Sequence, residues 1–176
     1  NPGGLYGRLT YEMKLSPFTL SECEAFFKSN SIVLSQRDVV QAYMAFGGIP
    51  YYLGYFEPGL SLAQNVDKIL FAPNGPLVHE YNRLFQSLFT HSEEYQKIVT
   101  MLATRNYGST RKEISEACGI SMGGNLSLML KTLIDSDFVI SYTPIVQQRK
   151  SEYFRLCDPF CLFYLRFAHQ KKGIEI

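Results

Sequence analysis

The sequence lacks an excess of charge of either sign. Its 17 lysines and arginines are balanced by 16 aspartates and glutamates, which leaves a formal net charge of +1. A protein dedicated to nucleic acid or to an anionic membrane surface normally carries a clear basic surplus. The composition therefore gives no electrostatic reason to place the chain in either class.

Long apolar runs are also missing. No stretch approaches the roughly 20 apolar residues of a membrane-spanning helix, and no signal peptide opens the chain. The first residue is Asn1 rather than methionine, so we expect a fragment of a longer protein. We expect no membrane partner.

Cysteine is sparse and its spacing is uninformative for metal binding. The four cysteines are Cys23, Cys118, Cys157 and Cys161, and none forms a CxxC pair. The three histidines do not complete a zinc-ligand spacing. We therefore expect buried, reduced thiols in a cytoplasmic protein without a metal site.

A complete nucleotide-hydrolysis site is absent from the sequence. The usual phosphate loop, G-x-x-x-x-G-K-[ST], brings backbone amides, a lysine and a magnesium-binding hydroxyl together. Gly119 and Gly124 have the glycine spacing, but Asn125 and Leu126 follow where lysine and Ser/Thr are required. With neither this Walker A loop nor a Walker B strand, we expect no ATP hydrolysis by this chain alone.

Helix-start signals dominate the first half. The spacings Ser21-x-x-Glu24 and Ser35-x-x-Asp38 are capping boxes, and Gly47-Gly48 predicts the end of the second helix. An apolar stripe that includes Val40 and Met44 is expected on this second helix. Further helices are predicted over residues 51–56, 61–71 and 76–90. The aromatic cluster of Tyr51, Tyr52, Tyr55 and Phe56 is interpreted as core.

The second half predicts a different module. Amphipathic periodicity indicates helices over 92–105, 110–118 and 121–135, then strands over 138–142 and 152–156. Three helices followed by a hairpin within about 65 residues is the order of a winged helix. An alternating segment, 9–15, predicts one strand near the start, and the aromatic segment 158–168 predicts a last helix.

Three motifs carry a family resemblance. They are Leu5-Tyr6-Gly7-Arg8 before the first strand, Gly47-Gly48-Ile49-Pro50 between helices, and Asp158-Pro159-Phe160 after the hairpin. With these motifs in this order, the chain resembles the C-terminal half of the archaeal-type ATPases, a prokaryotic family related to AAA+ and STAND nucleotide hydrolases. The resemblance spans nearly the whole sequence.

The resemblance implies a mainly α fold with a small β hairpin, in which a helical AAA+-type lid precedes a winged helix-turn-helix domain. Residues 1–16 correspond to the last strand region of an ATPase core and residues 17–91 to the lid. Residues 92–157 correspond to the winged helix, and 158–176 to the start of a C-terminal helical extension. The phosphate loop and magnesium ligands of the family would precede Asn1.

The family's nucleotide contacts carry over to four residues. Arg8 corresponds to an arginine finger that reaches a neighbouring subunit's ATP, although a surface or strand-edge arginine is the alternative. Pro50 corresponds to the proline that packs on adenine in STAND relatives, with Gly47 and Gly48 beside it. A corner between two helices is the alternative for all three. ATP and Mg²⁺ are therefore expected in the parent protein, and neither is expected on this chain alone.

The predicted winged helix does not by itself show whether its partner is DNA or protein. Residues 121–135 would be the recognition helix, with Lys131 as its one basic residue, while Arg149 and Lys150 in the wing could contact a DNA backbone. Base readout favours arginine, and affinity needs several phosphate contacts. We therefore expect regulatory output or docking of a protein partner or a second copy, besides the upstream ATPase core of the same chain. The alternative is a winged-helix DNA-binding regulator.

Overall fold

The computed structural model describes residues 15–145 and 151–169. The predicted strand over 9–15 falls almost wholly outside these residues, as do Arg8, Arg149 and Lys150. Within the described part the protein is mainly helical with a small three-stranded antiparallel sheet. No helix in these two ranges is long and apolar enough to cross a membrane.

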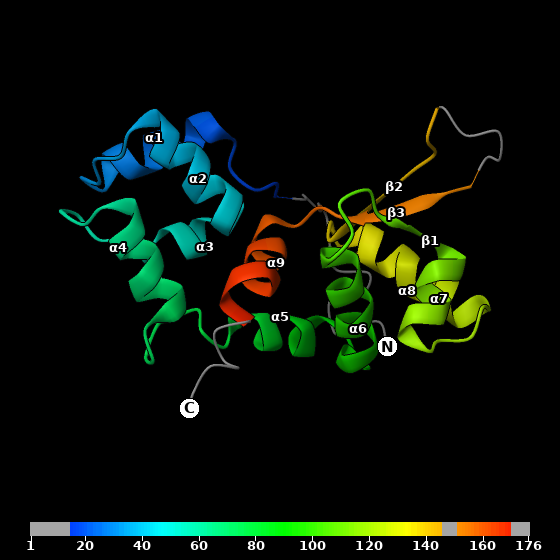
Figure 1. The fold of residues 1–176 in the computed structure, drawn as a ribbon. Helices are drawn as coiled ribbons and strands as arrows, with labels where there is room; N and C mark the ends of the chain where they lie inside the picture. The colour runs from blue at the N-terminus through cyan, green and yellow to red at the C-terminus, as the bar shows by residue number, and fades with distance from the viewer. Residues whose placement is uncertain (1–14, 146–150, 170–176) are drawn as a thin grey trace, which may run out of the picture.

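The helices form two groups with a C-terminal helix between them (Figure 1). The first group and the helix that leads out of it are α1 (Leu20–Ser29), α2 (Gln36–Phe46), α3 (Pro50–Leu53), α4 (Leu62–Val66), the π-helical turn η1 (Asp67–Phe71) and α5 (Glu80–Leu88). The second group is α6 (Ser92–Ala103), β1 (Ser109–Thr110), α7 (Arg111–Cys118), α8 (Gly124–Asp135), β2 (Val139–Tyr142) and β3 (Tyr153–Leu156). The chain closes with α9 (Pro159–Phe163) and a second π-helical turn, η2 (Tyr164–Ala168).

The cap of α1 corrects one prediction. The capping box is formed by Thr19 and Glu22, whose side chain accepts from the Thr19 backbone N–H at 2.7 Å, and not by Ser21 and Glu24. Both pairs have the same spacing, so the pattern alone does not choose between them. The buried residues of α1 are Cys23 and Phe27. Ser35 and Asp38 cap α2 as predicted.

Two other predicted helices begin later than expected. Residues 76–79 form a turn, and α5 starts at Glu80 because the Leu77 backbone N–H donates to the Ile69 carbonyl at 3.1 Å and tucks Leu77 into the core. Helix α8 starts at Gly124 rather than Ser121, since consecutive glycines disfavour helix. The predicted run over 61–71 is helical from Leu62, after the N-cap Ser61, and its second half is η1. The predicted helix over 51–56 is wrong in its bounds, since α3 starts at Pro50 and ends at Leu53, and residues 54 and 55 form a turn.

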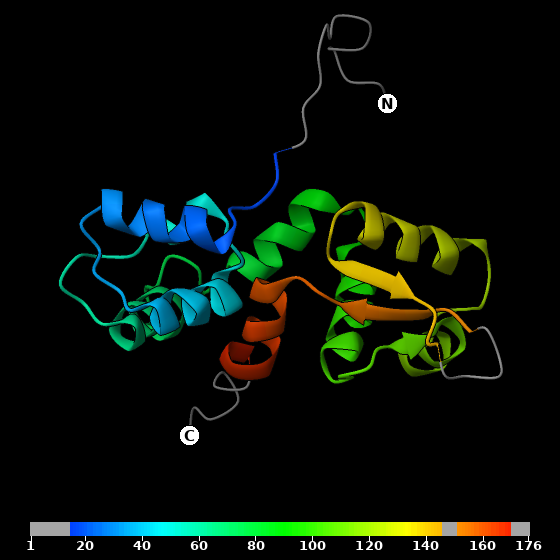
Figure 2. The same cartoon turned by 90° about the horizontal axis from the view of Figure 1, so that it is seen from above.

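The sheet contains one strand more than the predicted hairpin. Strand β3 is central and pairs antiparallel with β2 and with the short β1, in the order β1-β3-β2. Ser109 and Thr110 are too few to show a period in the sequence. Figure 2 shows β2 and β3 lying beside α8, with α7 below them.

Helix α9 joins the two groups. It packs against α2 on one side and against α6 on the other. Its Phe160 is buried, and its ring lies 4.8 Å from the ring of Tyr52, between centroids. Helix α5 adds a second link, because the rings of Phe85 and Phe138 lie 5.2 Å apart. One hydrophobic core therefore runs through both groups.

Candidate functional site

The two glycines of the GGIP motif form a tight corner between α2 and α3. Gly47 has a φ of 72° and Gly48 a φ of 63°, both in the left-handed region that glycine adopts without steric cost. The Gly48 carbonyl accepts from the Phe18 backbone N–H at 2.7 Å. A Cβ on Gly48 would lie 2.2 Å from the Phe18 carbonyl oxygen. The glycines therefore allow the backbone of the corner to pack closely against the backbone of the segment at Phe18.

Gly47 contributes to the same crossing. It is buried, and a Cβ there would lie 3.4 Å from the ring of Pro159 at the start of α9. The corner thus holds the segment before α1 on one side and α9 on the other. Together the two glycines set the direction in which the chain enters α3.

Pro50 is the exposed member of the motif. It occupies the first turn of α3, where its missing N–H costs no helix hydrogen bond. The residues exposed with it are Tyr51 and Gly54, with Tyr55 half-buried, while Tyr52 and Leu53 point into the core. This spacing gives α3 one outward face with a proline ring and an aromatic ring side by side in sequence.

The prediction that all four aromatic residues after Pro50 are core is wrong for Tyr51. Tyr52 and Phe56 are 5% exposed, but Tyr51 is 58% exposed. The sequence carries a partial signal for this difference, since on an ideal helix Tyr51 and Tyr55 share one side, and Tyr52 and Phe56 share another side roughly 100° away.

Two tyrosines on this outward face are fixed to each other. The Tyr55 hydroxyl donates to the Tyr51 hydroxyl at 2.7 Å, and their rings meet edge to face with centroids 5.3 Å apart. The hydrogen bond to Tyr51 raises the pKa of the Tyr55 hydroxyl. Exposed aromatic side chains held in one place are a common feature of binding surfaces.

Helix α5 supplies two charged groups that act on the tyrosines of α3 and of the turn after it. The Tyr52 hydroxyl donates to a Glu80 carboxylate oxygen at 3.3 Å, and burial together with the Glu80 charge raises the pKa of Tyr52. Arg83 is exposed, and the positive charge of its guanidinium lowers the pKa of the Tyr55 hydroxyl. It therefore opposes the rise in the Tyr55 pKa that the hydrogen bond to Tyr51 causes.

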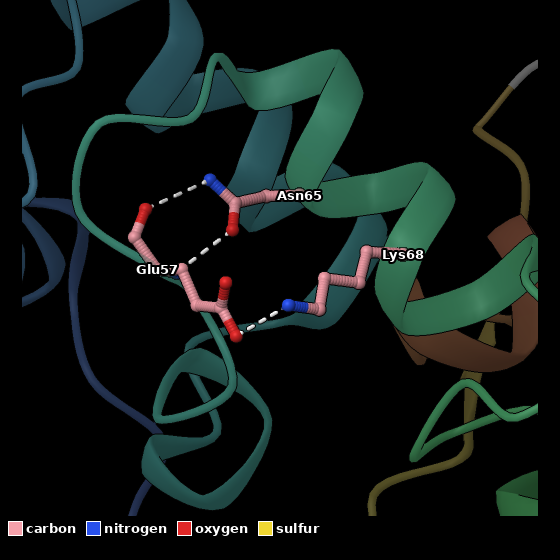
Figure 3. Close-up of polar contacts among 3 residues, drawn as sticks. All are labelled: Glu57, Asn65 and Lys68. Carbon is pink, nitrogen blue, oxygen red and sulfur yellow. Dashed lines mark hydrogen bonds and ion pairs between the residues drawn. The ribbon is translucent and has the colours of Figure 1, made fainter.

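A buried asparagine fixes the loop that leaves α3 (Figure 3). The Asn65 side chain accepts from the Glu57 backbone N–H at 2.8 Å and donates to the carbonyls of Glu57, Leu60 and Ser61. The Glu57 carboxylate also pairs with Lys68 at 2.6 Å, on the exposed side of the loop. The C-terminal end of α3 is thereby tied to α4 and η1.

An apolar groove of about 990 Å³ lies between α2, α4 and α9 with η2. Met44, predicted to point into the core, is instead 64% exposed and lines this groove together with Val33 and Phe167. Val40 from the same predicted stripe is also exposed, at 43%. Arg166 lies at the groove and is held by the Ala103 carbonyl and the Asn106 side chain, each at 3.1 Å.

The outward surface of α8 carries more apolar than basic character. Lys131 is exposed there, far along the chain from the GGIP corner and in the other group of helices. Met122, just before α8, is 56% exposed, and Leu128 on α8 is 62% exposed. Arg111 is bound to α8, since its Nη1 donates to the Ser127 hydroxyl at 2.6 Å.

The four cysteines are free thiols; Cys23 and Cys161 are buried as predicted, whereas Cys118 and Cys157 are only partly buried. Burial raises the pKa of each, and most strongly that of Cys161. Within residues 15–145 and 151–169, no group of three or more His, Cys, Asp or Glu is placed to hold a metal ion.

Over residues 15–145 and 151–169 the fold is mainly helical with a small antiparallel sheet, and an aromatic-rich surface follows the glycine corner. A protein of Methanocaldococcus jannaschii, named Uncharacterized protein MJECL04, is 30% identical to the chain over 166 residues. The match covers 93% of this chain but only 36% of that relative's length. No family model matches the sequence, and no solved structure matches it significantly.

Proposed function

We propose that this chain is the lid and winged-helix part of a longer ATP-binding ATPase of AAA+/STAND type. In this role it senses nucleotide and passes the signal to a regulatory or docking surface, without hydrolysing ATP by itself. The observation that carries the proposal is the exposed Pro50, set at the start of α3 directly after a rigid glycine corner. Proline offers a flat apolar face and a fixed φ, which suits contact with an adenine ring.

The order of elements supports the second half of the proposal. Helix α6, strand β1, helices α7 and α8 and the hairpin of β2 and β3 follow each other as in a winged helix. The greater length of the matching relative agrees with a parent protein that extends well beyond this chain. In this proposal the phosphates and Mg²⁺ are bound by the upstream core, because residues 119–126 lack the lysine and hydroxyl that a phosphate loop requires.

Calorimetric titration of ATP against the full-length protein and against the 176-residue chain tests the proposal. We expect micromolar binding to the full-length protein and no measurable binding to the chain alone, since phosphate contacts dominate affinity. Pro50→Ala in the full-length protein should weaken ATP binding, and Pro58→Ala, in the exposed loop after α3, is the matched control. Full-length protein that binds no ATP would refute the proposal.

Arg8 has a separate expected role as an arginine finger from one subunit to the next. Replacing it with alanine in the full-length protein should slow ATP hydrolysis, by roughly 10³-fold if the finger is fully engaged, and should leave ATP affinity nearly unchanged. A rate equal to that of the unmodified protein would identify Arg8 as an ordinary surface residue.

The surface of α8 favours protein docking over DNA binding as the output. Leu128 and Met122 expose apolar side chains where a DNA reader would need cations, and Lys131 is the single basic residue of α8. DNA binding through Lys131, Arg149 and Lys150 remains the competing proposal. A gel shift at low salt separates the two, because tight, salt-sensitive binding that Arg149→Ala and Lys150→Ala abolish would favour DNA.

A further inference from the structure

A small polar cavity adjoins the apolar groove between α2, α4 and α9. It has a volume of about 260 Å³ and lies between the end of α6 and η2, where Thr100, Asn106 and His169 are among the residues that line it. Arg166 lines both this cavity and the 990 Å³ groove. The two spaces therefore meet at one arginine, whose apolar stem can border the groove while its charged head lies at the polar cavity.

The guanidinium of Arg166 is fixed in place but is not neutralised. Its Nε–H donates to the Ala103 carbonyl and its Nη2 group to the Asn106 side-chain oxygen, each at 3.1 Å. Both acceptors are uncharged, and no carboxylate within residues 15–145 and 151–169 forms an ion pair with this arginine. A cap on the last turn of α6 explains the bond to Ala103. It leaves the Nη1 and Nη2 end of the fork, which can bind a carboxylate through two parallel hydrogen bonds.

The surroundings of this fork suit an anion. No aspartate or glutamate is among the described residues that line the polar cavity. Asn106 accepts from Arg166 through its oxygen, which leaves its NH₂ group as a further donor. A carboxylate in this cavity would therefore meet one positive charge and an amide donor, with no negative charge beside it.

The groove suits an apolar chain. Met44 is 64% exposed and Phe167 is 57% exposed along it, so a ligand that covers them removes apolar surface from water. Asp38 is the one carboxylate among the described residues of the groove, and it already accepts from the Ser35 backbone N–H and hydroxyl. Asp38 lies in the first turn of α2, and Figure 2 shows that turn at the end of α2 far from α9. The two charges of the groove are therefore at different ends.

We propose that the groove and the polar cavity together bind a long-chain carboxylate, with its hydrocarbon chain in the groove and its head on the free end of the Arg166 fork. The charge of Asp38 opposes the reversed orientation, in which the carboxylate would lie at the first turn of α2. This site is separate from the Pro50 corner and does not depend on ATP binding.

Calorimetric titration of the full-length protein with dodecanoate, dodecanol and dodecyltrimethylammonium tests the site, because these probes share one chain length and differ in the charge of the head. Dodecanoate should bind at least about tenfold more tightly than the other two, as for hydrogen bonds to a charged group. Decanoate should bind about tenfold more weakly than dodecanoate, since it buries two methylenes fewer. Equal affinities for dodecanoate and dodecanol, or a preference for the cation, would overturn the proposal.

Two variants separate the head from the chain. Arg166→Ala should lower the affinity for dodecanoate about tenfold and leave that for dodecanol unchanged, whereas Phe167→Ala should weaken both. Arg37→Ala is the matched control, since Arg37 is an exposed residue of α2 that does not line the groove; it should change neither affinity. A loss of dodecanoate binding in Arg37→Ala as large as in Arg166→Ala would reveal a general charge effect and overturn the assignment. If circular dichroism shows that Arg166→Ala is unfolded, the comparison of the three heads in the unmodified protein decides.

Discussion

Gly48 lies where a methyl group would overlap the main chain of Phe18. Its left-handed φ and the 2.2 Å approach to the Phe18 carbonyl make any side chain costly in two ways. Gly59 has a φ of 80° but no heavy atom within 4 Å of its ideal Cβ. Substitution of Gly59 therefore measures the cost of the left-handed backbone alone, and substitution of Gly48 measures this cost together with that of the steric overlap.

Gly48→Ala should lower the free energy of unfolding by about 3 kcal/mol, because alanine is strained in the left-handed region and also displaces Phe18. Gly59→Ala should cost only about 1 kcal/mol, the conformational part alone. Urea denaturation of the two variants measures the difference. Equal losses would mean that the segment around Phe18 moves aside freely.

Asn65 is fully buried, and its amide meets four backbone groups of the loop from Glu57 to Ser61. Asn65→Ala should cost about 2–3 kcal/mol, since it leaves several of these groups without a partner. Lys68→Ala removes only the exposed ion pair with Glu57 and should cost at most about 1 kcal/mol. If thermal melts show the larger loss for Lys68→Ala, the loop is not held as Figure 3 shows.

Asp158 caps α9 through a 2.7 Å hydrogen bond from the Cys161 backbone N–H, yet burial raises the pKa of its carboxyl. A carboxyl whose pKa is higher in the folded state binds protons more tightly there. Its contribution to stability is therefore complete at acid pH and is lost as the pH rises through the folded pKa.

Asp158→Asn keeps a side chain that can cap α9 and removes the charge. Relative to the unmodified protein, we expect this variant to gain stability as the pH rises from about 4, near the ordinary aspartate pKa, up to the raised pKa of the folded state, and to gain no more above it. Chemical denaturation at several pH values measures this difference. A gain that is the same at every pH would exclude the carboxyl as its source.

At the scale of elements, local signals specify helix boundaries well where a capping box or a terminal glycine is present, and less well elsewhere. The caps of α2 and α7 are predicted by Ser35, Thr110 and the glycines at the ends of these helices, because each signal acts within four residues. The start of α5 is not predicted by local signals, since it depends on a hydrogen bond from the Leu77 N–H to the Ile69 carbonyl in η1. Local patterns carry no information on such pairings.

The cap of α1 allows a direct test of two overlapping signals. Thr19→Ala should cost about 1 kcal/mol, the usual loss for an N-cap side chain, whereas Ser21→Ala, inside the first turn and exposed, should change stability by less than about 0.5 kcal/mol. Equilibrium unfolding in urea is sufficient for both. The reverse order of effects would assign the cap to Ser21.

The candidate site is predictable from the sequence only in part. The GGIP motif selects Pro50, and the structure leaves it exposed, but the exposure of Tyr51 escapes prediction because an aromatic cluster is more often core. The 990 Å³ groove could not be predicted, since it combines residues near 33, 62 and 163. Contacts between segments this far apart depend on the packing of α9.

At the scale of the whole molecule, α9 binds both groups of helices, so we expect them to unfold together. Phe160→Ala should cost about 3–5 kcal/mol, as for other large buried aromatic residues, and should reduce hydrogen-exchange protection in both α2 and α6. Leu128→Ala, at an exposed position on α8, is the control and should change neither. Loss of protection confined to α2 would show that the groups are independent.

The position of α9 also limits where recombination can divide the gene without exposing the core. The helices from residue 20 to 88 are completed by a segment about seventy residues further along the chain, because Pro159 covers Gly47 and Phe160 covers Tyr52. A gene rearrangement that moved only the codons for residues 1–90 would leave the α9-facing surface of α2 uncovered. Recombination should therefore transmit the two groups as a single block.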